Sequence, residues 1–242
     1  MTLSYSAVWD DLTAMARANS SVLLAIAGVF LFLPGLLVAY FIPQPQSDAS
    51  RILADLWTYH AANAHWLLLG TIVNMAGAIA MLLLLLDRDG RTVGNAIAGT
   101  LPILPAYFIA SLLAGLAIGC GLLLLIVPGL YLFGRLAVLG PVLVTEERHP
   151  LRALARSFEL TRGKGWAIIG LVALVAAAAL VLGFALIAVV GTLFRLLASD
   201  RLELLLVAML SAFASAMLSG VLILLYAALY RRLAGAGPSS GT

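Results

Sequence analysis

The stretch 101-LPILPAYFIASLLAGLAIGCGLLLLIVPGLYLFGRLAVLGPVLVT-145 decides the fold, because Arg135 carries the only charge in its 45 residues. A membrane-spanning helix needs about 20 apolar residues, so this run predicts two consecutive spans. Two turn sites compete. A turn at Gly119-Cys120-Gly121 gives spans at about 101–118 and 122–145, whereas a turn at Pro128-Gly129 leaves a fourth span of only 17 residues. Length favours the first turn, with Pro128-Gly129 as a kink in span 4.

Four further apolar runs lie outside this stretch, at about 21–42, 64–86, 166–193 and 203–229. The chain is 63% hydrophobic and 10% charged, whereas a soluble domain is about 25% charged. We therefore exclude a soluble globular protein. The sequence predicts an all-α integral membrane protein, a six-transmembrane-helix bundle that forms one membrane domain over residues 1–242.

The polar segments between the runs are short. Residues 1–20 and 149–163 have apolar residues at helical spacing and charges on the other face, which predicts two helices lying in the membrane interface. Residues 51–60 predict a helical turn or two on the opposite surface. Residues 233–242 are rich in Gly, Ser and Pro, which predicts a flexible tail.

The distribution of basic residues predicts the orientation. With the N-terminus inside, the inner segments hold ten of the 14 Lys and Arg residues, the outer loops hold three, and Arg135 lies within a span. Cytoplasmic loops of membrane proteins carry an excess of Lys and Arg, so both termini are predicted to be cytoplasmic. The inner basic residues are Arg17, Arg88, Arg91, Arg148, Arg152, Arg156, Arg162, Lys164, Arg231 and Arg232.

Several other classes of protein are disfavoured. The first 20 residues carry two aspartates and no basic run, and the first apolar run ends without a small-x-small cleavage site, so we interpret it as a retained span rather than a signal peptide. Cys120 is the single cysteine, which excludes an intramolecular disulfide and predicts a packing residue. Basic residues are too few for a nucleic-acid-binding face.

An internal repeat is an open question in this sequence. Leu31-Phe-Leu-Pro-Gly-Leu and Leu125-Ile-Val-Pro-Gly-Leu share a pattern in spans 1 and 4, which run in opposite directions, as an inverted repeat requires. The interfacial helices before spans 1 and 5 instead indicate a parallel register, and chance matches arise easily in a chain rich in Leu and Gly.

The segment 125–169 carries a resemblance to known proteins. It contains PGLY at 128–131, Arg135 four residues later, Glu146 at the end of the span, and ALARSFELTRGKGW at 153–166. In these features it resembles the membrane-domain family of glycerophosphoryl diester phosphodiesterases and the YciC-like inner-membrane proteins. The resemblance implies a bacterial inner-membrane protein acting in envelope or lipid homeostasis. The phosphodiesterase barrel that some members carry has no counterpart here, so the enzymatic activity does not follow.

The polar residues predict no catalytic site. All eleven acids lie in loops or at span ends, so no carboxylate pair or proton relay lies within the membrane. His60 and His65, with Asp55, offer a weak alternative of a metal site, but histidines of the membrane interface beside Trp57 and Trp66 are the favoured interpretation. We expect that the protein is not an enzyme and that it binds no cofactor or metal.

Arg135 is the most informative residue for function. It lies ten residues, or about 15 Å of helix, from Thr145. A charge at such depth usually faces the bundle interior or a wet cavity. We expect it to bind freed backbone carbonyls, Asn74 in span 2, or an anionic lipid. The two alternatives are a structural arginine and a ligand contact, for which Arg135 and Asn74 are the candidate residues.

Two further groups of residues are candidates for contacts. Small residues that let helices approach predict packing at Gly115 and Gly119 and along Ser211, Ser215 and Ser219, for which a polar lining is the alternative. Basic residues predict an interface with anionic lipid, at about 1 kcal/mol per charge near the surface. They are Arg152, Arg156, Arg162 and Lys164.

Two functional classes follow. The first is a non-enzymatic protein of envelope or lipid homeostasis that binds or transports a lipid or small amphiphile at an interior cavity near Arg135. The second is a scaffold that binds another membrane protein, or a second copy of itself, through small-residue helix faces. Membrane lipids are the expected partners and nucleic acid is not.

Overall fold

The computed structural model describes residues 5–42, 50–86, 92–197 and 200–235, and the regular elements in these ranges are all helices. Six helical segments are long and apolar enough to cross a membrane. This confirms the prediction of an all-α chain with six such segments. They are Ser20–Phe41, Ile52–Leu86, Leu104–Leu124, Ile126–Thr145, Gly165–Thr192 and Leu202–Gly235.

The first apolar segment is one continuous helical rod with a widened turn. It consists of α2 (Ser20–Ile26), the π-helix η1 (Ala27–Phe32) and α3 (Leu33–Phe41). Pro34 is the second residue after η1, and its ring would clash with the carbonyl four residues earlier in a regular α-helix. The wider π turn places that carbonyl elsewhere. Gly77 of the neighbouring helix accommodates the widened turn, because a Cβ there would lie 2.5 Å from Phe30 Cβ.

The second segment, α4 (Ile52–Leu86), is a single helix of 35 residues. At 1.5 Å per residue it is about 52 Å long, which exceeds the roughly 30 Å hydrocarbon core of a bilayer. The predicted surface helix at 51–60 and the span at 64–86 are therefore not separate elements. Residues 61–63, Ala-Ala-Asn, carry no Gly or Pro that would end the helix between them.

The turn between spans 3 and 4 lies at neither predicted site. After the short helix α5 (Val93–Thr100), α6 runs over Leu104–Leu124, Leu125 adopts an extended conformation, and α7 (Ile126–Arg135) follows at once. Pro128 sits in the first turn of α7, where its missing N–H costs no hydrogen bond, and its ring prevents a helix from continuing through Leu124. The bounds predicted at 101–118 and 122–145 were therefore wrong at this turn.

Two of the glycines that we considered as turn residues, Gly121 and Gly129, pack against each other inside this hairpin. A Cβ on Gly121 would lie 2.9 Å from Gly129 Cα, and one on Gly129 would lie 2.5 Å from Leu122 N. Both positions therefore let the two backbones approach where any side chain would separate them. The fourth segment then breaks a second time at residues 136–138, between α7 and α8 (Leu139–Thr145).

The remaining helices complete a central hub. They are α1 (Tyr5–Ala18), α9 (Pro150–Leu160), α10 (Gly165–Leu197) and α11 (Asp200–Gly235). Helices α1 and α9 lie within residues 1–20 and 149–163, the two segments predicted to form interfacial helices. Of the predicted tail, residues 233–235 belong to α11, and residues 236–242 lie outside the described ranges.

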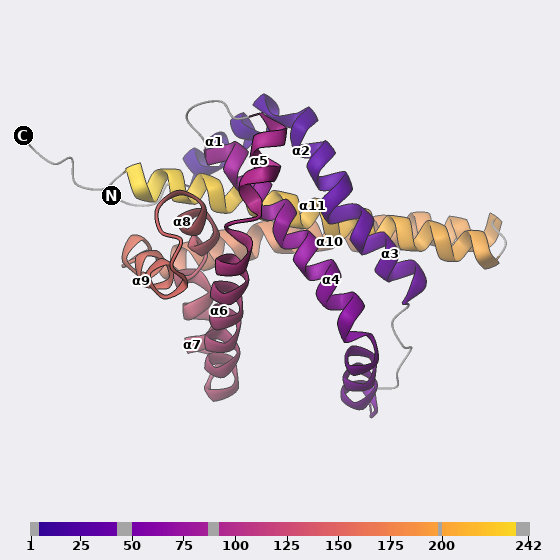
Figure 1. Cartoon of the computed structure of the whole chain (residues 1–242). Helices are drawn as coiled ribbons and strands as arrows, with labels where there is room; N and C mark the ends of the chain where they lie inside the picture. The colour runs from indigo at the N-terminus through magenta and orange to yellow at the C-terminus, as the bar shows by residue number, and fades with distance from the viewer. Residues whose placement is uncertain (1–4, 43–49, 87–91, 198–199, 236–242) are drawn as a thin grey trace, which may run out of the picture.

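The long helices diverge from this hub. In Figure 1, α6 and α7 extend as one pair, α10 and α11 as a second, and α3 and α4 toward a third side. The main buried cluster combines Val8 and Leu12 of α1 with Val142 of α8, Ile168 of α10 and Leu229 of α11, all close to one end. Further out the helices are exposed, as at Leu182 and Phe184 of α10, so this apolar surface needs lipid around it.

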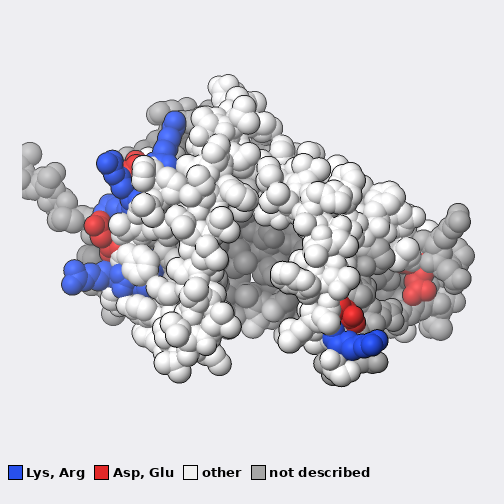
Figure 2. Space-filling model, turned by 60° about the horizontal axis from the view of Figure 1, so that its bottom comes forward, with Lys and Arg blue, Asp and Glu red and all other residues white. Residues whose placement is uncertain are grey.

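Charged residues lie at the two ends of the described structure. Figure 2 shows most Lys and Arg side chains, with some acids, at the end where the hub lies, and a smaller set at the far ends of the helices. The surface between these ends shows no charge on this face. Such an uncharged belt is typical of a membrane protein, whereas the orientation and the cytoplasmic position of α1 and α9 remain predictions.

Candidate functional site: Arg135, the Asn74 cleft and the charged end

Arg135 ends α7 and holds α9 against it. Its Nε donates to Thr161 Oγ1 at 3.1 Å, one terminal nitrogen donates to Tyr131 Oη at 2.7 Å, and the other donates to the carbonyl of Phe158. The guanidinium also lies over the rings of Tyr131 and Phe158, at 5.5 and 5.0 Å from their centroids. Each of the three nitrogens therefore has a partner from the protein.

The backbone of Arg135 takes part in the same junction. Its carbonyl accepts a hydrogen bond from Ser157 Oγ at 2.9 Å, and Thr161 Oγ1 lies 3.0 Å from the same oxygen. Ser157 and Thr161 are completely buried. Since α7 ends at Arg135, this carbonyl would otherwise lack a helical partner. The side chain and carbonyl together thus fasten α9 to the break between α7 and α8.

Two glycines bring α10 to this junction. A Cβ on Gly134 would lie 2.7 Å from the carbonyl oxygen of Gly165, and one on Gly165 would lie 3.2 Å from Arg135 Cδ. The residues that carried the family resemblance, at 131–135 and 153–166, therefore meet in space. Their common role in this structure is to join α7, α9 and α10.

Arg135 and Asn74 do not meet, contrary to one of the alternatives drawn from the sequence. Asn74 donates from Nδ2 to the carbonyl of Gly70 in its own helix at 2.9 Å and lines a cleft between α3, α4 and α11. None of the residues that line this cleft belongs to α7 or α9. The cleft that Asn74 lines is therefore separate from Arg135, so the two candidate residues do not share one cavity.

The cleft around Asn74, called here the Asn74 cleft, has a volume of about 580 Å³. Its polar lining residues are uncharged: Tyr59, Thr71, Asn74, Ser211 and Ser215. Tyr59 donates to the carbonyl of Ile42 at 2.9 Å, Thr71 to that of Leu67 at 2.8 Å, and Ser211 to that of Ala208 at 3.0 Å.

Two groups in the Asn74 cleft lack partners among the described residues. These are the amide oxygen of Asn74 and the hydroxyl of Ser215. The remaining lining is apolar and includes Pro34, Val38 and Leu67. A pocket with few convergent polar groups and apolar walls is typical of a small-molecule site, and here it suits an amphiphile.

Ser211 and Ser215 of α11 line this cleft, whereas other residues of the same stretch make the buried contacts. The buried residues in this stretch are Ala208, Ala212 and Ala216. Ala212 approaches α3 closely, because a Cβ on Gly35 would lie 3.7 Å from Ala212 Cβ. Ser211 and Ser215 thus follow the alternative of a polar lining, whereas Ser219 is half-exposed and does not line the cleft.

The predicted contact at Gly115 and Gly119 does not form within the described residues. A Cβ on either glycine would meet nothing within 4 Å, whereas Gly121 on the same helix is in tight contact. The close contact between α6 and α7 thus lies nearer the hairpin tip, at Gly121. The two glycines remain open positions on the surface of α6.

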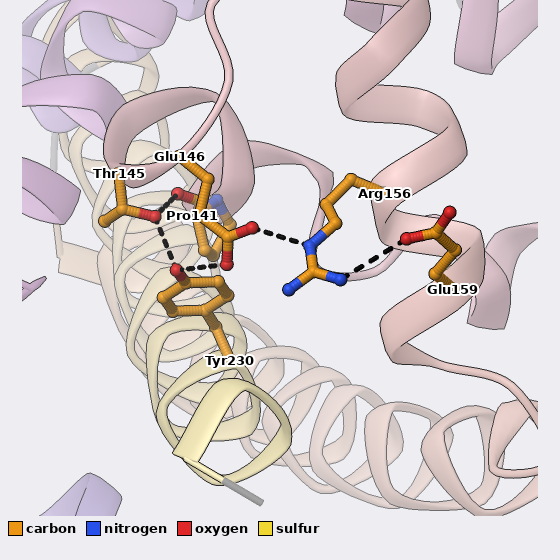
Figure 3. Close-up of polar contacts among 6 residues, drawn as sticks. All are labelled: Pro141, Thr145, Glu146, Arg156, Glu159 and Tyr230. Atoms are coloured by element: carbon orange, nitrogen blue, oxygen red, sulfur yellow. Dashed lines mark hydrogen bonds and ion pairs between the residues drawn. The ribbon is translucent and has the colours of Figure 1, made fainter. Parts of the chain in front are cut away.

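A polar network joins α8, α9 and α11 at the charged end (Figure 3). Glu146 accepts from Arg156 Nε at 2.6 Å with one oxygen and from Tyr230 Oη at 2.7 Å with the other. Thr145 Oγ1 lies 2.7 Å from the same Tyr230 oxygen. Arg156 also pairs with Glu159 at 3.3 Å. The hydrogen bond to Glu146 is the main cause that raises the pKa of Arg156.

The four basic residues predicted to face anionic lipid have different surroundings. Arg156 belongs to this network through its 2.6 Å contact with Glu146, whereas Arg152 is exposed and lies 3.9 Å from Glu147. Arg162 is exposed and Lys164 half-buried. Arg152 and Arg162 are thus the better placed for head groups, and lipid binding by all four remains a prediction.

The other candidate residues have ordinary surroundings. His60 and His65 are exposed on α4, and their rings lie 5.3 Å from those of Tyr59 and Trp66, respectively. Within the described ranges, no three His, Cys, Asp or Glu residues are grouped as a metal site would require. Cys120 is exposed, contrary to the expectation that it is a small packing residue.

Sequence reasoning missed the partners of the candidate residues. Thr71 and Asn74 share a face of α4 at a spacing of three, and Ser211 and Ser215 share a face of α11 at a spacing of four. This periodicity identifies both faces, but no local signal shows that they meet. The same holds for Glu146 and Tyr230, which are 84 residues apart.

Comparisons with known proteins identify no relative: no family model, no curated protein and no solved structure matches the chain. The resemblance of residues 125–169 to the membrane-domain family is therefore still a prediction.

Proposed function

We propose that this chain is a non-enzymatic, multi-pass protein of the bacterial inner membrane that binds or transports a lipid or small amphiphile in envelope or lipid homeostasis. The Asn74 cleft is the observation that carries this proposal. It lies between three apolar segments, has a volume of about 580 Å³, and offers the amide oxygen of Asn74 and the hydroxyl of Ser215 to a ligand. We therefore place the proposed binding site in this cleft and not at Arg135.

The lining supports a neutral amphiphile over an ion. Among the described residues no charged side chain lines the cleft, and burying a charge without a counter-charge is very costly. An amphiphile that carries a hydroxyl or amide near its apolar part satisfies Asn74 and Ser215 and covers Val38 and Leu67. Hydrolysis at this site is disfavoured as well, because the described lining holds no carboxylate, histidine or cysteine.

A matched pair of substitutions on α11 tests this function. Ser215→Leu fills the cleft, and Ser219→Leu makes the same change one turn further along the helix, outside the cleft. Both variants are reconstituted in nanodiscs of phosphatidylethanolamine and phosphatidylglycerol, released, and analysed by native mass spectrometry. We expect Ser215→Leu to lose one retained lipid and Ser219→Leu to keep it. Equal lipid retention by both variants would contradict the proposal.

The second candidate, a scaffold, rests on the open glycines of α6. Since Gly115 and Gly119 have no neighbour within 4 Å, another helix has room to approach there. A second copy of the chain is the simplest partner, and Gly119→Leu then lowers the dimer fraction measured by single-molecule photobleaching in liposomes. A monomer in both proteins removes this candidate in its self-associating form.

A further inference from the structure

A second cavity lies nearer the charged end and shares no lining residue with the Asn74 cleft. It has a volume of about 320 Å³ and is bounded by α4, α6, α7, α8, α11 and the turn between α7 and α8. Of the described residues that line it, Tyr107, Ser111 and Tyr226 carry hydroxyls and none is charged. We call it the tyrosine cavity.

The hydroxyls of the tyrosine cavity have no hydrogen-bond partner within the described residues. By contrast, the fully buried hydroxyls of Thr100, Ser157 and Thr161 are all hydrogen-bonded. The Tyr107 hydroxyl lies against Gly140, where a Cβ would be 3.1 Å from Oη. Tyr107, Ser111 and Tyr226 are half-buried. Within a membrane-spanning segment the exposed part of such a side chain meets lipid and not bulk water, and hydroxyls withdrawn from water usually find a partner. Three on one cavity therefore favour a bound partner.

The chemistry of the lining limits what that partner is. Phenolic and seryl hydroxyls donate well to an acceptor oxygen, but the absence of a lining Lys or Arg disfavours a phosphate or carboxylate. The remaining walls, including Leu82, Ile118 and Ile223, are apolar. The cavity thus fits an uncharged oxygen attached to a hydrocarbon chain.

The depth of the cavity matches one part of a lipid. Tyr226 lies one helical turn, about 6 Å, from Tyr230, which binds Glu146 at the charged end. The polar interface of a bilayer is roughly 5–7 Å thick on each side, so Tyr226 falls where head groups give way to hydrocarbon. The ester carbonyls of glycerolipids occupy this level.

The tyrosine cavity also has an opening toward lipid. Gly115 lines it and is exposed, and a Cβ there would meet nothing within 4 Å. Figure 2 shows a hollow in this face of the molecule, between the α6–α7 pair and α4. We propose that the tyrosine cavity binds the ester region of a membrane glycerolipid, with Tyr107 and Tyr226 donating to its carbonyl oxygens and a chain leaving past Gly115.

Paired lipids that differ only at the proposed contact test this proposal. Full-length protein in detergent is titrated with dioleoyl phosphatidylglycerol and with its diether analogue, which has the same head group but no carbonyls. Thermal unfolding reports binding. We expect the diether to bind more weakly, by about two- to tenfold for each of the two neutral hydrogen bonds that it cannot accept. Equal affinities would overturn the proposal and leave ordered water as the partner of the hydroxyls.

Substitutions locate the effect. Tyr107→Phe with Tyr226→Phe should abolish the preference for the diester while leaving the lipid-free protein at least as stable, since the unpaired hydroxyls are gone. Gly115→Leu should block the cavity and Gly119→Leu, its neighbour on the same open surface, should not. A diester preference that survives both the double substitution and Gly115→Leu contradicts the site.

This inference and the proposed function fail separately. Ser215→Leu lies in the other cleft and should leave the diester preference unchanged. Loss of lipid retention by Ser215→Leu without any diester preference supports only the Asn74 cleft, and the converse result supports only the tyrosine cavity.

Discussion

Arg135 illustrates at the residue scale how a charge within an apolar segment is accommodated by its own chain. The guanidinium donates to Tyr131, Phe158 and Thr161, and its carbonyl accepts from Ser157. The side chain has a partner at each of its three nitrogens, which favours a structural role, one of the two alternatives derived from the sequence. Tyr131 precedes Arg135 by four residues on α7, and the other partners lie on α9 or directly after its end, 22 to 26 residues further along the chain.

Arg135→Leu should destabilise the protein. It removes the charged donor from Phe158 O and from the buried Thr161, and hydrogen bonds to charged groups contribute about 1.5–3 kcal/mol each. We expect these two bonds to make a loss of about 3–6 kcal/mol, measured as a lower denaturation midpoint. Arg135→Lys should recover little of it, because an ammonium cannot bond in three directions within one plane. Unchanged stability in both variants would show that the junction does not depend on Arg135.

Glu146 and Glu147 form a matched pair for the network at the charged end. Glu146 bonds to Arg156 and Tyr230 at 2.6 and 2.7 Å, whereas Glu147 is 3.9 Å from an exposed Arg152. Glu146→Gln should lower stability by about 1 kcal/mol, and Glu147→Gln should have almost no effect, since exposed ion pairs contribute little. Chemical denaturation of both variants measures the difference, and equal effects would contradict this ranking.

The α6–α7 hairpin shows at the element scale how two apolar helices turn without a polar loop. The residues at its tip are strongly exposed, with Leu123 at 89% and Leu124 at 81%. No charged residue lies between the start of α6 and Arg135. An apolar tip of this kind is stable in the membrane or its interface, and not in water.

Gly129→Ala should separate the two helices of this hairpin. The new Cβ would lie 2.5 Å from Leu122 N, a backbone atom that cannot move aside without shifting α6. We expect a loss of about 2–3 kcal/mol, the range of overpacked sites. Gly119→Ala is the control, because its Cβ meets nothing and alanine favours a helix by up to about 1 kcal/mol. The two variants should shift the unfolding midpoint in opposite directions.

The native Cys120 tests where the hairpin turns. A turn at Gly119–Gly121 places this thiol in the outer loop, but the turn at Leu125 places it more than one helical turn from the tip. We expect Cys120 in intact cells to resist a membrane-impermeant maleimide and to react with a permeant one. Leu125→Cys in a Cys120→Ala background provides the comparison at the tip. Rapid labelling of Cys120 by the impermeant maleimide would instead support a turn at Gly119–Gly121.

The arrangement of hub and diverging helices is a property of the whole molecule. The buried cluster and most of the charges lie at one end, and the helices separate toward the other (Figures 1 and 2). The ion pair between Asp11 and Arg232, at 2.6 Å, joins α1 to the end of α11 there. Lipid therefore has access between the outer parts of the helices, where the Asn74 cleft lies.

The predicted orientation is tested with two engineered cysteines in a Cys120→Ala background. Ser47 follows the first apolar segment and Ser239 follows the last. With six spans and both termini in the cytoplasm, Ser47→Cys should react with an impermeant maleimide from the periplasm, and Ser239→Cys should react only after lysis. Equal labelling of both in intact cells would contradict the orientation.

The sequence by itself determined the class of protein and the number of its long apolar helices. Both depend on local quantities, the apolar length of each run and the scarcity of charge, and a bilayer makes these nearly sufficient. The sequence also singled out Arg135, Asn74 and Ser211 as polar residues among apolar ones. It did not locate the turn at Leu125, because three glycines and a proline each offered a local break.

Only the tertiary structure decided which of these residues meet. Arg135 bonds to α9 and not to Asn74, Ser211 and Ser215 face Asn74 across a cleft, and Gly121 and Gly129 form a contact and not a turn. The physical reason is that helical periodicity fixes which residues share a face. Which face packs against which depends on the close approach of backbones, and this is set by residues up to 141 positions apart, such as Asn74 and Ser215.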